Sequence, residues 1–285
     1  MTKRWFLDSG NISDILKSKA LFEELAQFHW HYYSELAFQR NQIREQLKSS
    51  LRDKAGSFEF QNWQRVVKYK YSLDPLSAKG SLVDPGGRFN IGEIDPTRYP
   101  VFPALYIASN KGTAMAEALG REKTTGALSP EEVALTKPDS IAVLSVSGKL
   151  ESILDIRERG NLAPLVNLTK NFKLSKSLVL SARKLHFPLR LITTAKELGS
   201  VLEQRDWRNW PMVFDVPSTC QVFGALVMNA GIEGILYNSA ITGKGCIAIF
   251  PQNFLNSSSF LQLDDAVPSE KVQRRVDSSN FVSVL

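Results

Sequence analysis

An arginine that directly follows two glycines is the first feature of this sequence that suggests chemistry. It lies in the stretch DPGGRFNIG, residues 84–92, with an asparagine two positions after it. Glycine allows positive φ angles and lets the backbone approach a ligand closely because it has no Cβ. Arginine presents a rigid fork of N–H donors for carboxylate or phosphate. The stretch therefore predicts either a loop that holds an anion against bare backbone, or a tight turn in which Arg88 is merely solvated.

Three later stretches contribute further candidate side chains. ALYIAS supplies Tyr106, TAMAEAL supplies Glu117 and ILYNSA supplies Ser239. Each has an ordinary explanation when taken alone, since a glutamate on a helix is usually solvated and a serine at the end of a strand usually forms a turn. The order and spacing of the four stretches are the informative feature.

In this order, the four stretches resemble the RES domain, a bacterial family named after its Arg, Glu and Ser. GGRFN is similar to the family's glycine–glycine–arginine–aromatic–asparagine loop, and ALYIAS to its Leu-Tyr strand. TAMAEAL is similar to its Thr-Ala-x-x-Glu helix, and GIEGILYNSA to its late Gly-Ile-x-Tyr-x-Ser element. The resemblance extends over residues 63–250. Members of the family include NAD-destroying toxins of toxin–antitoxin pairs, and the family's fold is similar to that of ADP-ribosyltransferases.

The resemblance implies that NAD binds as a substrate, with no separate cofactor. Arg88 is expected to bind the pyrophosphate, and the exposed N–H groups of Gly86 and Gly87 are expected to form an anion-binding nest beside it. Asn90 is expected to brace the loop or to touch the ligand. The Tyr106 ring is expected to stack on nicotinamide or an adjacent ring, with its hydroxyl free to hydrogen-bond. The NAD-binding set is therefore Gly86, Gly87, Arg88, Asn90, Tyr106 and Ser239.

The same resemblance implies cleavage of the nicotinamide N-glycosidic bond of NAD. Glu117 is expected near the nicotinamide ribose, where a carboxylate stabilises the positive charge that develops as the bond breaks. Ser239 is expected to position a ribose hydroxyl or a phosphate oxygen. Nicotinamide leaves as a neutral base from a cationic precursor, so this chemistry requires neither a general acid nor a metal. The predicted catalytic residues are Glu117, Arg88, Tyr106 and Ser239.

Several functional alternatives remain open from the sequence. The acceptor is either water, which makes the protein an NAD glycohydrolase, or phosphate as co-substrate, which makes it a phosphorylase. A toxin that depletes NAD is expected to have a cognate helix-turn-helix antitoxin or another immunity protein as its partner. A second hypothesis is an ADP-ribosyltransferase that modifies a protein or a nucleic acid. A third, from another class, is an inactive basic nucleotide-binding module.

Composition excludes several other classes. The 285 residues are 43% hydrophobic and 22% charged, which is ordinary for a soluble globular protein. The net charge of +6 includes no dense Lys/Arg run with interleaved aromatics, so a nucleic-acid partner is not expected. The two cysteines and three histidines lack metal-ligand spacing. No stretch approaches the ~20 apolar residues of a membrane span, so the chain is expected to be cytoplasmic without a membrane partner.

The elements that must position the site follow from the hydrophobic pattern. Helical spacing of apolar residues runs from about 11 to 54, and Gly56 is a candidate stop. Around ALYIAS, strict alternation places Phe102 and Tyr106 on one face of a strand and Leu105 on the other. TAMAEAL follows as a helix, with Thr113 expected as its cap and Gly120 as its break.

The remaining pattern completes the predicted organisation. Ser218 is expected to cap a helix that precedes two strands, GILYNS and GCIAIF. Gln221, early in that helix, is left outside the predicted site. We predict an α+β fold with a bent or split, mostly antiparallel sheet resembling that of ADP-ribosyltransferases, surrounded by helices. Its parts are a helical appendage (1–60) that packs on the core, a catalytic domain (61–255) and a tail (256–285) that wraps the surface or frays.

Overall fold

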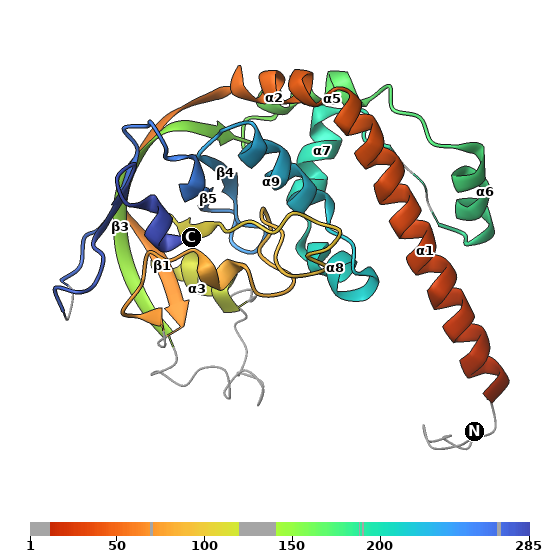
Figure 1. Cartoon of the computed structure of the whole chain (residues 1–285), viewed down its shortest axis with the longest axis horizontal. Helices are drawn as coiled ribbons and strands as arrows, with labels where there is room; N and C mark the ends of the chain where they lie inside the picture. The colour runs from red at the N-terminus through yellow and green to blue at the C-terminus, as the bar shows by residue number, and fades with distance from the viewer. Residues whose placement is uncertain (1–11, 69–70, 120–140, 188, 190, 267–268) are drawn as a thin grey trace.

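The computed structural model describes residues 12–68, 71–119, 141–187, 189, 191–266 and 269–285 (Figure 1). Within them, seven strands form one sheet in the order β1-β2-β5-β4-β3-β6-β7. The strands are β1 (Ala55–Lys68), β2 (Leu105–Ala108), β3 (Ile141–Asp155), β4 (Gly234–Asn238), β5 (Gly245–Ile249), β6 (Phe260–Leu263) and β7 (Arg275–Asp277).

Helices cover this sheet and connect its strands. The α-helices are α1 (Ile12–Gln42), α2 (Arg44–Arg52), α3 (Lys111–Leu119), α5 (Ala163–Thr169), α6 (Lys176–Lys184), α7 (Ala195–Leu202), α8 (Asn209–Phe214) and α9 (Thr219–Asn229). Short 3₁₀ turns are η2 (Lys79–Ser81), η4 (Arg159–Leu162), η5 (Arg205–Arg208), η6 (Pro251–Asn253) and η7 (Phe281–Val284). No single helix in the described ranges is both long and apolar enough to cross a membrane.

The sheet closes on itself, which the sequence did not predict. β1 and β3 pair with each other from Ala55 opposite Leu154 to Lys68 opposite Ile141, so β1, β2, β5, β4 and β3 form a barrel. The α+β class and the mostly antiparallel pairing are confirmed, since only β3 and β4 run parallel. Long, twisted strands bring the two edges of a sheet together, and β1 and β3, of 14 and 15 residues, are long enough to do so.

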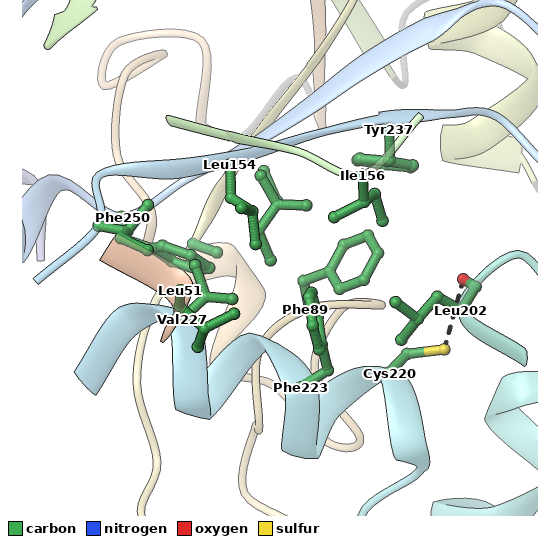
Figure 2. Packing of buried hydrophobic residues seen from close by; sticks show 14 of the residues in the cluster. Leu51, Phe89, Leu154, Ile156, Leu202, Cys220, Phe223, Val227, Tyr237 and Phe250 are labelled. Atoms are coloured by element: carbon green, nitrogen blue, oxygen red, sulfur yellow. Dashed lines mark hydrogen bonds between the residues drawn. The ribbon is translucent and has the colours of Figure 1, made fainter. Parts of the chain in front are cut away.

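Side-chain alternation in β2 separates the two hydrophobic clusters of the protein. Tyr106 packs against the cluster that contains Phe102, which we call the main cluster. Leu105 belongs to the second cluster on the opposite face of the sheet. The predicted register of this strand is therefore confirmed. Figure 2 shows part of the main cluster, where Phe89 lies between α9 and the strand residue Tyr237.

Of the two N-terminal helices, α2 packs on the main cluster. Leu47 and Leu51 of α2 are fully buried within the main cluster. α1, which precedes α2 in the chain, extends away from the barrel toward its own N-terminal end (Figure 1). Gly56 does not end the helical segment, because α2 ends at Arg52 and β1 already begins at Ala55.

The His29 side chain of α1 packs against α8 within a cluster of aromatic rings, which we call the aromatic cage. Its ring centroid lies 4.4 Å from that of Trp210 and 4.2 Å from that of Phe214, and Phe187 closes the cage at 4.9 Å. Burial lowers the pKa of His29 from 6.5 to about 4. The folded protein therefore favours the neutral ring, whereas the unfolded chain binds a proton near the ordinary pKa.

We expect this histidine to make folding stability fall in mild acid. Between the unfolded pKa of 6.5 and the folded value of about 4, the unfolded chain binds more protons than the native one, so stability decreases as pH falls through that window. The His29→Phe variant removes the titration and should flatten this part of the profile. Urea unfolding across the window measures it, and equal slopes in the two proteins would contradict the assignment.

The C-terminal tail is an ordered part of the sheet, contrary to the prediction that it wraps the surface or frays. β6 pairs with β3, and β7 pairs with β6. Leu261, Leu263 and Val276 are fully buried in the second cluster. The Ser- and Asn-rich composition of this segment favoured a loop over a strand. Its strands are short, and their apolar residues complete the second cluster.

Candidate active site

The glycine loop is closed by hydrogen bonds within the protein. The Gly86 N–H donates to the Val83 carbonyl at 2.7 Å, and the Gly87 N–H donates to Asn90 Oδ1 at 2.9 Å. Both N–H groups are therefore already used, and the expected anion-binding nest is not formed by them. The glycines serve close packing instead, because a Cβ on Gly87 would lie 2.4 Å from the Tyr106 hydroxyl oxygen.

Asn90 is the centre of the loop. Its Oδ1 accepts hydrogen bonds from the Gly87 N–H and from the Tyr106 hydroxyl, each at 2.9 Å. Its Nδ2 donates to the carbonyls of Ser81 and Phe102, at 2.8 and 3.1 Å. The side chain is fully buried, and these bonds use the whole capacity of an amide. Of its two predicted roles, the structure confirms that Asn90 braces the loop.

Tyr106 joins this loop to β2. Its hydroxyl accepts a hydrogen bond from the Phe89 N–H at 3.0 Å and donates one to Asn90. The hydroxyl that was expected to be free to hydrogen-bond is therefore already engaged by the loop. Burial raises the pKa of Tyr106 well above its ordinary value, so the hydroxyl keeps its proton and remains a donor.

Arg88 is buried rather than solvated, with 7% of its surface exposed. Its Nη1 donates to the carbonyls of Leu202 and Gln204, at 3.2 and 2.7 Å, just where α7 ends. The guanidinium also lies over the Trp207 ring, 5.9 Å from its centroid. Among the described residues, its Nε–H has no acceptor. Arg88 therefore anchors the loop to α7 and retains donor capacity that the protein leaves unused.

Glu117 and Ser239 meet across 122 positions of sequence. The Ser239 hydroxyl donates to Glu117 Oε1 at 2.6 Å and accepts the N–H groups of Ile241 and Thr242, both at 3.1 Å. One donated and two accepted bonds saturate a serine hydroxyl. Ser239 thus orients the carboxylate, and within the described part of the chain no hydrogen bond engages the second oxygen, Oε2.

α3 is fixed to the β4–β5 turn by one face. Thr113 lies one turn before Glu117, and its Oγ1 is 3.0 Å from the Oγ1 of Thr242. Asn110, not Thr113, caps the helix, because Asn110 Oδ1 accepts the Thr113 N–H at 2.9 Å. Asparagine is as good a cap as threonine, and this choice frees the threonine for the turn. The predicted break at Gly120 falls outside the described residues.

The loop of Arg88 and Tyr106 and the pair of Glu117 and Ser239 share one face of the sheet. β5 lies between β2 and β4, with Tyr106 opposite Ala248 and Tyr237 opposite Cys246. Arg88 and Glu117 both act electrostatically on Tyr106, Tyr237 and Cys246. The pKa of Cys246 is raised to about 12, mainly by burial; Glu117 contributes to the rise and Arg88 opposes it. The structure therefore places the loop of Arg88 and Tyr106, and the pair of Glu117 and Ser239, at neighbouring strands of one sheet, with one charge of each sign.

The other described residues provide no candidate metal site. They contain no cluster of His, Cys, Asp and Glu side chains that could hold a metal ion. Two surface hollows, of about 580 and 280 Å³, lie away from the four residues. The first lies between α1 and the segment before α6, and the second beside β1, β3 and β6.

Gln221 is a site residue that sequence reasoning left out. Its Nε2 donates to the carbonyls of Pro85 and Asn90, at 2.6 and 3.1 Å, and its Oε1 accepts the Ser218 N–H at 3.0 Å. The predicted cap at Ser218 is confirmed. The spacing of Ser218 and Gln221 is that of a capping box, which predicts the local bond but gives no indication of the loop that the amide also holds.

The sequence matches the RES domain family over residues 62–266, more than half of the chain. In structure, the chain is similar to one in the crystal structure of the M. tuberculosis MbcT–MbcA toxin–antitoxin complex, with 16% sequence identity and a TM-score of 0.37. That similarity covers 84% of this chain and 97% of the other. No curated protein matches the sequence.

Proposed function

The chain belongs to the RES domain family, and we propose that it cleaves the nicotinamide N-glycosidic bond of NAD and acts as a toxin that depletes NAD. The observation that carries this proposal is the Glu117 carboxylate, which Ser239 holds on the sheet face that also carries Tyr106, the tyrosine bonded to the loop of Arg88. A fixed anion and a fixed cation on one face match a substrate that combines a developing cation with a pyrophosphate.

Glu117 supplies the electrostatic part of the reaction. The bond from ribose C1′ to the nicotinamide nitrogen breaks, its electron pair passes to the ring, and nicotinamide leaves as a neutral base. The ribose carbon becomes positively charged, and a carboxylate beside it lowers the barrier. Water or phosphate then bonds to C1′, and attacking water loses one proton to solvent. Because Ser239 holds Oε1, Oε2 is the oxygen that faces this carbon in the proposal.

Arg88 supplies the binding part. Its Nη1 is committed to the end of α7, which fixes the orientation of the guanidinium plane. The guanidinium donors that the protein does not use then bind a pyrophosphate oxygen. Tyr106 contributes its ring, since its hydroxyl is held by the loop. Ligand hydrogen bonds from Gly86, Gly87 and Asn90 are not part of this proposal, because their groups are already paired.

Nicotinamide release from NAD by the purified full-length chain tests the proposed function. Release in phosphate-free buffer, with ADP-ribose as co-product, identifies a glycohydrolase. Release that requires phosphate, with a phosphorylated ADP-ribose, identifies a phosphorylase. Release only with an added macromolecule that becomes labelled would favour the alternative, an ADP-ribosyltransferase. Binding of NAD without any release of nicotinamide would favour the third hypothesis, an inactive nucleotide-binding module.

A protein partner follows from the toxin proposal. Family resemblance favours a cognate helix-turn-helix antitoxin or another immunity protein, acting in the cytoplasm. Co-expression with the neighbouring gene product should restore growth and NAD levels if that product is the antitoxin. Persistent NAD loss in the presence of that product would remove it as a candidate.

Replacing Arg88 by lysine should weaken NAD binding more than it slows turnover of bound NAD. Lysine keeps the positive charge but loses the fork that reaches the α7 carbonyls and the phosphate together. We expect the Kd for NAD to rise on the order of tenfold, the cost of one charge-assisted hydrogen bond. Calorimetry measures it, with Arg98→Lys as control, since Arg98 is exposed and pairs with Asp95 outside the site. An unchanged Kd for Arg88→Lys would contradict the binding role.

A further inference from the structure

The first turns of α9 lie directly against the glycine loop, and we propose that Gln221 is a positioning residue that sets the loop for NAD binding. This inference rests on the proposed function, and it adds a residue on a different element from those of the four motifs. The Gln221 side chain is fully buried. In the proposal Gln221 does not contact NAD itself, so any effect on NAD binding must pass through the loop.

Gln221 holds the loop at both ends. Its Nε2 donates to the carbonyl of Pro85, before the two glycines, and to the carbonyl of Asn90, two residues after Arg88. Its Oε1 is held in turn by the backbone N–H of Ser218, so the amide cannot rotate without losing that bond. One rigid amide therefore spans the segment that carries Arg88.

A second contact makes the position of the loop sensitive to α9. Gly224 lies one turn after Gln221, and the Phe89 carbonyl approaches it so closely that a Cβ would lie 2.0 Å from that oxygen. Cys220 lies immediately before Gln221 in α9. Its Sγ is 3.5 Å from the carbonyl oxygen of Leu202, which is one of the acceptors of Arg88 (Figure 2). α9 thus contacts both the loop and the end of α7 to which Arg88 is anchored.

These contacts explain why Gln221 positions the site rather than only stabilising the fold. The carbonyl that it holds at Asn90 belongs to the residue whose side chain also holds Tyr106. A shift of the loop therefore moves Arg88 and Tyr106 together relative to α7. Glu117 is fixed separately by Ser239, so the reacting end of the site should be unaffected.

The test compares two amides that each donate to two backbone carbonyls. Gln221→Met keeps the length of the side chain and removes the donors. Asn253→Leu is the matched control, because Asn253 Nδ2 donates to the carbonyls of Met228 and Ile232 at the other end of α9. Both variants should lose stability, and only Gln221→Met should raise the KM for NAD, on the order of tenfold, with kcat within about twofold.

A second variant adds a readout that a purely structural role would not change. Gln221→Glu has one O–H donor when protonated and none when ionised, and burial should raise the pKa of the introduced carboxyl toward neutrality. Its KM for NAD should therefore rise with pH between about pH 6 and 8, relative to wild type. A parallel profile in the two proteins would overturn the inference, as would a wild-type KM in folded Gln221→Met.

Hydrogen exchange separates this inference from the proposed function. The N–H groups of Gly87, Phe89 and Gly92 bond within the loop or to Tyr106, so they report its order without any substrate. Faster exchange there in Gln221→Met, and not in Asn253→Leu, supports the positioning role even if wild-type protein releases no nicotinamide. Unchanged exchange overturns it, whatever the activity of the wild type.

Discussion

Replacing Glu117 by glutamine is expected to lower the rate of nicotinamide release by about 100- to 1,000-fold, the usual effect of losing one well-placed electrostatic group. The amide oxygen of glutamine still accepts the Ser239 hydrogen bond, so the side chain should keep its place and lose only its charge. Charge on Glu117 matters most as the ribose becomes cationic, which is a property of the transition state. NAD binding should therefore stay near normal while kcat falls.

Single-turnover kinetics and calorimetry together measure this split between rate and binding. Glu158→Gln is a suitable control, because Glu158 is exposed and lies before η4, outside the four motifs. Ser239→Ala should reduce the rate less, since it releases Oε1 without removing the charge. Near-normal turnover in folded Glu117→Gln protein would rule out the electrostatic role.

The four motif residues were predictable because each lies in a short element with a clear local pattern. Alternation identified the face of β2 that carries Tyr106, and Ser218 marked the start of α9. Residue order then linked these elements to one family, which the match over 62–266 confirms. Their catalytic roles are not tested by the fold and stay predictions.

The partners of these residues were not predictable, because they depend on contacts between distant segments. The acceptors of Arg88 are backbone carbonyls at 202 and 204, and any residue type offers a carbonyl. The same applies to the carbonyls of Pro85 and Asn90 that Gln221 holds. Side-chain identity predicted the donors in these pairs and gave no information about the acceptors.

Barrel closure was missed for a related reason. The first residues of β1, Ala55 to Phe60, were assigned to the helical appendage, although Phe58 and Phe60 alternate with polar residues as a strand requires. Because that stretch is placed in the appendage, a strand as long as β1 is not predicted there. A longer β1 would have predicted the extensive β1–β3 pairing that closes the sheet.

Replacing Gly224 by alanine is expected to destabilise the protein and to weaken NAD binding, the reverse of the usual effect in a helix. Alanine in a helix interior is normally about 1 kcal/mol more favourable than glycine. Here the added Cβ would lie 2.0 Å from the Phe89 carbonyl oxygen and 2.5 Å from its carbon. Both are backbone atoms of the glycine loop, so relief requires the loop or α9 to move. Overpacking of this kind costs about 1–3 kcal/mol.

Gly160 provides the control for the predicted loss of stability in Gly224→Ala. Gly160, in η4, has nothing within 4 Å of its added Cβ, so Gly160→Ala should leave stability near that of wild type. Thermal unfolding of both variants, with the KM for NAD measured below the transition, separates strain at the loop from a general effect of alanine. Because the Gly224→Ala clash falls on the residue next to Arg88, its KM should rise along with the loss of stability. Wild-type stability in Gly224→Ala would mean that α9 does not contact the loop at this distance.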